Sequence, residues 1–399
     1  MPPVQDRPSR FGDLDDARRH HDPELVEKIC RSVFETDTAA DRLVEAFAEL
    51  PGGAGWRMLD TALRDGMDAV PDAPPALAEF LEDALHPPDW VDFELVDRGA
   101  VAWWRAGGQL QLLALTAGSL AYGYSTSFAR PLLLTGRLEQ MAGRRLGETS
   151  RWVLQATRPG ALHPGADGLK QTIRIRLVHA LVRRHLRGSD AWDTANWGEP
   201  ISVGDTLATG IIGFFTYPVA GLRDLGIDYT DDELEAMTHQ WAWISHLMGV
   251  PHEYLPTTYA EAVEIADAAA AVEDVRIEGA DRLVHALFFH ALVPPRFAPG
   301  PLRRPVTSLV GHTFAAVARH WMGPERADLL RIADTRARAV VPLLRALVRL
   351  RVGARRAGLL PSDARMVRLE LQTADRIMDL AGAAPPMTPG RTAEEPVAA

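Results

Sequence analysis

Residues 169–186 read LKQTIRIRLVHALVRRHL, and the periodicity of this stretch decides the fold class. Its apolar residues recur three and four positions apart, which is the period of an α-helix rather than of a strand. At about 100° per residue, Arg176 and Arg183 flank His179 at about 40–60°. His179 shares its side of the helix with four uncharged residues, Thr172, Ile175, Val182 and Leu186. We predict a helix whose apolar face surrounds one imidazole.

Two interpretations fit this face. A neutral imidazole is a ligand for haem iron, aliphatic side chains cover a porphyrin face, and Arg176 and Arg183 would pair with the propionate carboxylates. Alternatively, the segment is a helix end at the protein surface, where His179 makes one ordinary hydrogen bond. The spacing alone leaves both interpretations open.

The preceding segment, residues 143–160, reads GRRLGETSRWVLQATRPG and predicts a second helix with a mixed stripe. Arg145, Glu148, Thr149 and Trp152 are spaced i, i+3, i+4 and i+7, so they share one side. The stripe fits a polar patch beside a cofactor or substrate. It equally fits a structural helix on which Arg145 contacts Glu148 or Thr149.

Helical periodicity continues from residue 23 to about residue 382, broken by Pro and Gly clusters, and alternating strand patterns are almost absent. We therefore predict an all-α fold, with a single large domain of about a dozen helices. Residues 1–22 form a polar N-terminal segment, and residues 383–399 have the composition of a disordered tail. Thr230 and Glu233 fit a capping box that starts a helix running to Gly249.

Composition excludes several classes of function. The 399 residues carry 43 basic and 53 acidic side chains, a net charge of -10, and no basic block that would bind nucleic acid. Cys30 is the only cysteine, which excludes internal disulfides, zinc ribbons, iron-sulfur clusters and c-type haem attachment. Nucleophile-elbow, zincin and phosphate-loop signatures are absent from the sequence.

Two uncharged stretches, residues 106–129 and 206–222, raise the question of a membrane span. The first contains many Gly, Ser and Gln residues, and the second is short and contains Pro218, so we expect buried core helices. The N-terminus lacks the apolar core of a secretory signal, and we expect a cytoplasmic protein. The sequence leaves peripheral contact with lipid open and does not define the oligomeric state.

The two helices together resemble a known family. The pattern Arg145-x-x-Glu148-Thr149, followed thirty residues later by Arg176-x-x-His179, is similar to that of the latex-clearing protein (rubber oxygenase) and mpaB-like haem oxygenase family. The resemblance extends from about residue 87 to residue 249, where HQWAWISHLMGV resembles another family segment.

The resemblance implies an all-α fold around a b-type haem, with His179 as the proximal iron ligand. Arg145 and Thr149 would lie near the distal side, where Arg145 would stabilise negative charge and Thr149 would donate a hydrogen bond. The implied activity is oxygenase cleavage of carbon-carbon double bonds in isoprenoid chains with dioxygen, giving carbonyl products. The long uncharged helices would supply a pocket for an apolar substrate.

Glu148 departs from the family pattern, because rubber oxygenases place a Lys at this position that can occupy the sixth iron position. Glu148 would leave the iron five-coordinate, act as a general base, or indicate a different use of the pocket. Since no export signal precedes the domain, we expect a soluble or membrane-dissolved lipid rather than a solid extracellular polymer.

We carry three hypotheses from the sequence. The first is a haem b oxygenase whose catalytic residues are Arg145, Glu148 and Thr149, acting on an apolar, unsaturated small molecule. The second is a helical binding module that holds haem or an apolar ligand without turnover. The third is a non-haem metal enzyme that uses His179 with carboxylates. His239 and His246, seven residues apart, fit core histidines better than metal ligands.

Overall fold

The computed structural model describes residues 8–134, 138–274, 277–294 and 297–381, with side chains for all of these except 138–145 and 380–381. Within these ranges the regular structure is helical, and the prediction of an all-α fold is confirmed. One antiparallel β-bridge, between Phe11 and Glu273, accompanies the helices.

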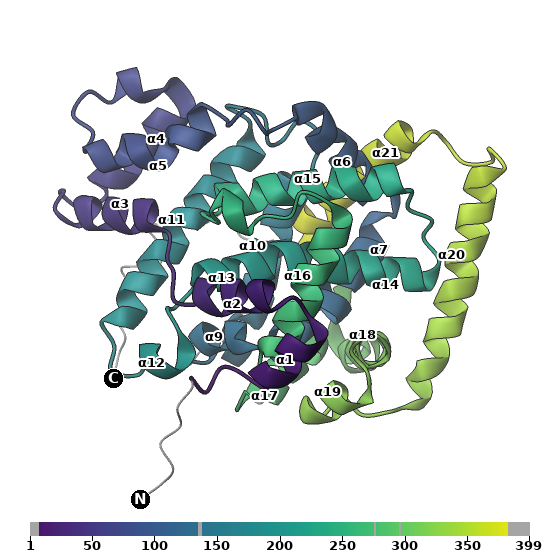
Figure 1. Ribbon diagram of the computed structural model, residues 1–399. Helices are drawn as coiled ribbons and strands as arrows, with labels where there is room; N and C mark the ends of the chain where they lie inside the picture. The colour runs from purple at the N-terminus through teal and green to yellow at the C-terminus, as the bar shows by residue number, and fades with distance from the viewer. Residues whose placement is uncertain (1–7, 135–137, 275–276, 295–296, 382–399) are drawn as a thin grey trace, which may run out of the picture.

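The N-terminal helices form one side of the molecule, and α3, α4 and α5 gather at the upper left of Figure 1. Their bounds are α1 Leu14–His20, α2 Pro23–Ser32, α3 Thr38–Ala48, α4 Ala54–Asp65, the 3-10 turn η1 Met67–Ala69 and α5 Pro75–Leu85.

The central helices build the core. They are α6 Phe93–Arg105, α7 Gly108–Leu113, η2 Ala114–Leu120, α8 Ala121–Gly123, η3 Ser127–Ala129, α9 Arg130–Leu134, α10 Leu138–Ala156, α11 Asp167–Arg187, α12 Thr194–Trp197, α13 Val203–Leu207, η4 Ala208–Thr216, α14 Tyr217–Leu225, α15 Asp231–Leu247, η5 His252–Tyr254 and α16 Tyr259–Val272.

The C-terminal helices cover the remaining side, and α20 stands at the right margin of the molecule (Figure 1). Their bounds are α17 Ala280–Ala286, η6 Leu287–Ala291, η8 Gly300–Leu302, α18 Arg303–Met322, α19 Pro324–Leu329, η9 Arg336–Ala339, α20 Val340–Arg356 and α21 Asp363–Ala381.

The crossing of α6 and α15 lies at the centre of the core. Trp103 on α6 and Trp241 on α15 are fully buried, with ring centroids 5.4 Å apart. A Cβ at Gly99 would lie 2.4 Å from the Ala236 carbonyl oxygen, so only glycine permits this approach of the two helices. The predicted capping box of Thr230 and Glu233 is confirmed at the start of α15.

Both uncharged stretches are interrupted by π-helical turns rather than continuing as plain α-helices. In the first, η2 lies between α7 and α8, and in the second, η4 lies between α13 and α14. A third π segment, η6, follows α17. These interruptions split helices that the periodicity predicts as single units, and the described residues form twenty-one α segments rather than about a dozen. Such π segments occur frequently at functional sites.

The N-terminal segment is folded onto the domain from residue 8. Phe11 and Ala17 are buried with residues of α2 and α16 in a second, smaller apolar cluster. Arg10 is 4% exposed. The described part of residues 1–22 is therefore continuous with the helical domain, while residues 383–399 lie outside the described residues.

Candidate functional site

The His179 side chain on α11 is half-buried, and one of its ring nitrogens is a fully buried, ligand-type atom. Its Nδ1 atom is buried and has no hydrogen-bond partner among the described residues. Burial, followed by the nearby positive charge of Arg183, lowers the pKa of His179 to about 4, although Asp37 opposes the shift. The ring is consequently neutral near pH 7, which is the form that binds a metal ion.

Arg176 and Arg183 flank this imidazole, as predicted, but both are ion-paired within the protein. The Arg176 Nε and Nη2 atoms donate to the two Asp37 carboxylate oxygens at 2.6 and 2.9 Å. The Arg183 Nε atom donates to Asp41 at 2.7 Å, and its Nη1 donates to the Ile201 carbonyl oxygen at 2.7 Å. These contacts fix α11 against α3, and they occupy the donors that the sequence assigned to haem propionates.

His179, Arg176 and Arg183 line one small hollow of about 220 Å³, together with residues such as Thr206 and Met248. Ligand sites in proteins usually measure about 300–1,000 Å³. The hollow is therefore a gap beside the imidazole and does not itself enclose a macrocycle.

The predicted stripe lies on α10. Glu148 and Thr149 are half-buried, whereas Trp152 is 8% exposed. The side chain of Arg145, the fourth member of the stripe, lies outside the described residues.

Trp152 joins this stripe to two other elements. Its Nε1 atom donates to the Thr172 hydroxyl of α11 at 3.1 Å. Its ring packs edge-on against Phe214 of η4, with centroids 5.4 Å apart. The stripe therefore faces both the histidine helix and the second uncharged stretch.

The contacts between α10 and α11 set their register. At the connection, a Cβ on Gly168 would lie 2.7 Å from the Gln155 carbonyl oxygen, so glycine is required there. The Trp152–Thr172 contact follows about one turn along both helices, which therefore run in opposite directions. Seven residues further on, this register brings Arg145 and His179 to the same level, with Thr149 about 6 Å away along the axis.

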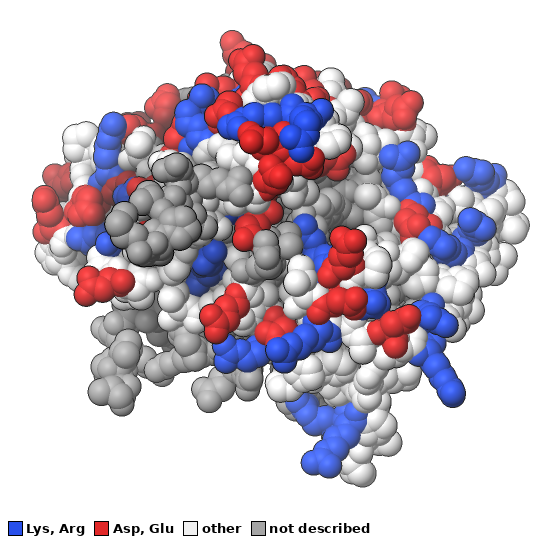
Figure 2. All heavy atoms as spheres, turned by 60° about the horizontal axis from the view of Figure 1, so that its bottom comes forward, with Lys and Arg blue, Asp and Glu red and all other residues white. Residues whose placement is uncertain are grey.

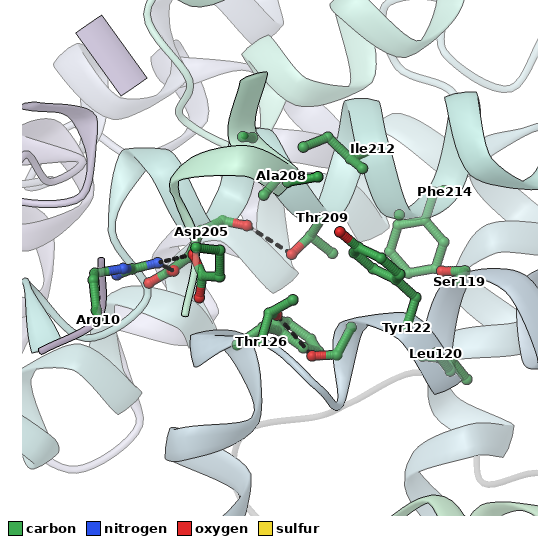
Figure 3. A pocket seen from close by; sticks show the side chains of 16 residues that line it. Arg10, Ser119, Leu120, Tyr122, Thr126, Asp205, Ala208, Thr209, Ile212 and Phe214 are labelled. Atoms are coloured by element: carbon green, nitrogen blue, oxygen red, sulfur yellow. Dashed lines mark hydrogen bonds and ion pairs between the residues drawn. The ribbon is translucent and has the colours of Figure 1, made fainter. Parts of the chain in front are cut away.

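A larger pocket of about 670 Å³, partly open to solvent, lies between the two π segments (Figure 3). Its walls come mainly from residues 119–128 and 205–214, which overlap the two uncharged stretches. The two uncharged stretches thus line a pocket, and its use by an apolar substrate stays a prediction. Leu120, Ile212 and Phe214 form an apolar end, and Phe214 is the residue that contacts Trp152.

The opposite end of this pocket is polar, and sequence reasoning missed it. The Arg10 Nη2 atom lies 2.8 Å from Asp205 and 3.6 Å from Glu273. In Figure 3, Arg10 and Asp205 lie at one side of the pocket and Phe214 at the other. Tyr122 lies between them, and the Arg326 guanidinium stacks over its ring at 4.0 Å.

The paired histidines of α15 have structural roles. The His239 Nε2 atom accepts the Asp92 backbone N–H at 2.9 Å. The His246 ring contacts the Val250 carbonyl oxygen at 3.2 Å and an Asp83 carboxylate oxygen at 2.9 Å, as expected of a core histidine. In the part of the chain that the structure describes, no three His, Cys, Asp or Glu side chains are grouped for metal binding. The non-haem hypothesis thus has no ligand set among these residues.

The fold and these sites define a class, namely an all-α protein with a neutral imidazole, buried at its Nδ1 atom, between helices and a separate pocket walled by π segments. Residues 104–352 match the family model described as the catalytic domain of ER-bound oxygenase mpaB/B' and rubber oxygenase. The chain belongs to this family, which confirms the resemblance predicted from the spaced Arg, Thr and His residues.

Two relatives illustrate the similarity. The chain is 28% identical over 216 residues to the rubber oxygenase of Streptomyces sp. (strain K30), covering 51% of this chain and 49% of that protein. It thus spans about half the length of this curated relative. The solved structure of latex clearing protein LCP in the closed state has a similar fold, with a TM-score of 0.62 and 22% identity, covering 90% of this chain and 93% of that one.

The length and apolar character of the helices bear on whether any of them could span a membrane. Within the described ranges, none is both long and apolar enough to cross a bilayer.

Proposed function

We propose that the chain is a haem b-dependent oxygenase that uses dioxygen to cleave carbon-carbon double bonds in an apolar isoprenoid or lipid-like small molecule. The observation that carries this proposal is the His179 imidazole, which is neutral and whose Nδ1 atom is buried with no hydrogen-bond partner among the described residues. Membership of a family of oxygenases supports the class of reaction.

The His179 imidazole fits an axial ligand of haem iron, whereas the 220 Å³ hollow beside it would have to widen to admit the macrocycle. A buried nitrogen without a partner is costly unless a ligand satisfies it, and neutral imidazole is a common axial ligand of haem iron. Arg176 and Arg183 would bind propionates only by exchanging Asp37 and Asp41 for them. In the present arrangement these arginines position His179 by holding α11 against α3.

A bound haem would supply the activation of dioxygen. The α10 stripe would then surround the reacting atoms from the opposite helix. The Glu148 carboxylate would accept or return a proton, the Thr149 hydroxyl would donate a hydrogen bond, and Arg145 would stabilise developing negative charge. Trp152, which is buried against Phe214, would keep water out of this region.

The pocket between η2 and η4 suits the proposed substrate class. Its apolar end would hold an isoprenoid chain, and Phe214 connects that end to the α10 stripe through Trp152. Burial of such a chain would be driven by removal of apolar surface from water. The hydroxyls of Tyr122, Thr126 and Thr209 would face any polar group on the substrate.

Dioxygen uptake by haem-loaded protein tests the proposal, with squalene as the unsaturated probe and squalane as its saturated control. We expect uptake and carbonyl products with squalene only. Glu148→Gln should lower the rate at least ~10-fold while haem content is unchanged, because proton transfer contributes on the order of 10²–10⁴-fold. Uptake no greater than that of haem bound to serum albumin would overturn the proposal.

The alternative is a helical module that binds haem or an apolar ligand without turnover. The specific observation in its favour is Glu148, which stands where the family resemblance places a Lys. Haem binding and squalene-dependent quenching of tryptophan fluorescence, without dioxygen uptake, would support this alternative.

A further inference from the structure

The outer face of α20 is apolar and unpartnered. The helix packs onto the molecule through Val341, Val348 and Val352, which are buried. Residues of the opposite face are strongly exposed: Leu343 58%, Leu347 54% and Leu350 72%. At about 100° per residue these three leucines lie within about 60° of one another, so they form one stripe.

The stripe continues beyond the helix and contains no charged residue. Leu359, in the turn that leads to α21, is 77% exposed. The small residues Ala346, Gly353 and Ala354 fill the spaces on the same face of α20. Monomeric proteins scatter exposed leucines singly, whereas a contiguous stripe marks an interaction surface.

The charged residues within α20 and the turn after it are all positive. Residues 335–362 contain seven arginines and no acidic residue, in a chain whose net charge is -10. Several of these arginines have partners elsewhere, as Arg345 has in Asp224 and Arg356 in Asp228. Arg349 is exposed and has no ion pair with any described residue.

The next helix adds three more exposed cations. Arg365, Arg368 and Arg376 on α21 are exposed, and none forms an ion pair within the described part of the chain. Figure 2 shows acidic and basic side chains interspersed over the face that it presents. The leucine stripe and unpaired arginines occur together on α20, its turn and α21, although α21 also carries Asp363, Glu370, Asp375 and Asp379.

We propose that α20 and the turn after it dock onto an anionic lipid surface. The leucine stripe would enter the boundary between headgroups and acyl chains, and the bordering arginines would contact anionic headgroups. Interfacial helices combine these same two features, an apolar face and basic residues at the polar edge. The position of α20 at the margin of the molecule leaves its outer face accessible (Figure 1).

Charge complementarity favours lipid over a second copy of this chain. A two-fold contact is self-complementary, so two α20 helices would meet with the same flanks beside each other. Since residues 335–362 contain no acidic side chain, such a contact would place arginine against arginine. An anionic membrane would instead neutralise these charges.

Vesicle flotation of the full chain tests this proposal and requires neither haem nor turnover. We expect binding to vesicles of phosphatidylcholine with phosphatidylserine, at least ~10-fold weaker binding to phosphatidylcholine alone, and weakening by high salt. The double variant Leu347→Glu, Leu350→Glu should lose at least ~10-fold in binding, and Arg349→Glu should lose several-fold. Leu309→Glu is the matched control, because Leu309 is 71% exposed on α18.

Three results would overturn the proposal: no binding to the anionic vesicles, binding that the α20 double variant leaves unchanged, or equal loss in the Leu309→Glu control. Sedimentation velocity without lipid distinguishes lipid docking from the alternative that a second copy of the chain covers the leucine stripe. A wild-type dimer that the double variant converts to a monomer would assign the stripe to a second copy of the chain. Failure of squalene oxidation leaves the vesicle result unaffected, so the two proposals fail separately.

Discussion

At the scale of single residues, the surroundings of His179 keep its ring neutral. Burial and Arg183 both disfavour the imidazolium, and Asp37, which would favour it, is already paired with Arg176. Sequence periodicity places the histidine among apolar residues, but it does not show that Nδ1 lacks a partner. The unpartnered Nδ1 atom is what makes His179 a candidate ligand, because the helix face alone fits two interpretations.

The pH dependence of stability of the haem-free protein checks this environment. Because the pKa of His179 is about 4 in the folded chain against a usual 6.5, unfolding increases its affinity for protons. The contribution of His179 to the free energy of unfolding is therefore fully present above pH 6.5. About 3 kcal/mol of it is lost as the pH falls towards 4. The free energy of unfolding in urea should differ less between pH 7 and pH 4.5 for His179→Gln than for wild type. An equal difference would contradict the neutral assignment, and His185→Gln on an exposed site is the control.

Substitution of Arg183, one of the two arginines beside His179, tests whether its ion pair positions α11. Arg183 is 2% exposed and pairs with Asp41. Arg183→Met should destabilise the haem-free protein by about 1–3 kcal/mol, because it removes this pair and the hydrogen bond to the Ile201 carbonyl oxygen, while Asp41 keeps its contact with Arg187. Arg184→Met is the matched control on the same helix, because its side chain is 47% exposed beside Glu45. The control should cost less than about 1 kcal/mol. Similar losses for both variants in denaturant unfolding would show that the Asp41 pair does not hold the helix.

At the scale of elements, α15 shows how one side chain can serve two purposes. Glu233 completes the capping box with Thr230, and its carboxylate also pairs with the Arg105 side chain, which is 3% exposed. The sequence predicts the first role from local spacing. It contains no local sign of the second, because Arg105 lies on α6.

Removal of this carboxylate should therefore cost far more than a cap. A lost N-terminal cap alone costs about 1 kcal/mol, whereas loss of the cap together with the charged pair to Arg105, which keeps Asp228 at 3.2 Å, costs about 2–4 kcal/mol. We expect Glu233→Ala to lie in the higher range and Asp232→Ala, an exposed neighbour, to change the free energy of unfolding by less than about 1 kcal/mol. Chemical denaturation measures both, and a Glu233→Ala cost as small as the control would refute the double role.

At the scale of the whole molecule, the sequence predicts what is local and periodic. Helix content, the α15 start and the two uncharged core stretches follow from spacing and composition. The ion pairs of Arg176 and Arg183 with Asp37 and Asp41 join residues more than a hundred positions apart. Such pairs have no periodic signature, so the sequence could not show that these arginines are engaged.

The larger pocket shows the same limit. Its apolar walls come from stretches whose lack of charge is visible in the sequence. Its polar end combines Arg10, Asp205 and Glu273, which only the folded chain brings together. The π-helical turns also escape prediction, because their hydrogen bonds span only one residue more than those of an α-helix, which leaves the apolar pattern of a short segment almost unchanged.

The most direct test of the central claim is the ultraviolet-visible spectrum of protein produced with adequate haem, together with iron quantified per chain. We predict a Soret band with near one haem per chain for wild type and for His185→Ala, and loss of the haem in His179→Ala with the fold retained by circular dichroism. A colourless, folded wild type that takes up no added haem, or a His179→Ala variant with full haem and an unchanged spectrum, would contradict the account.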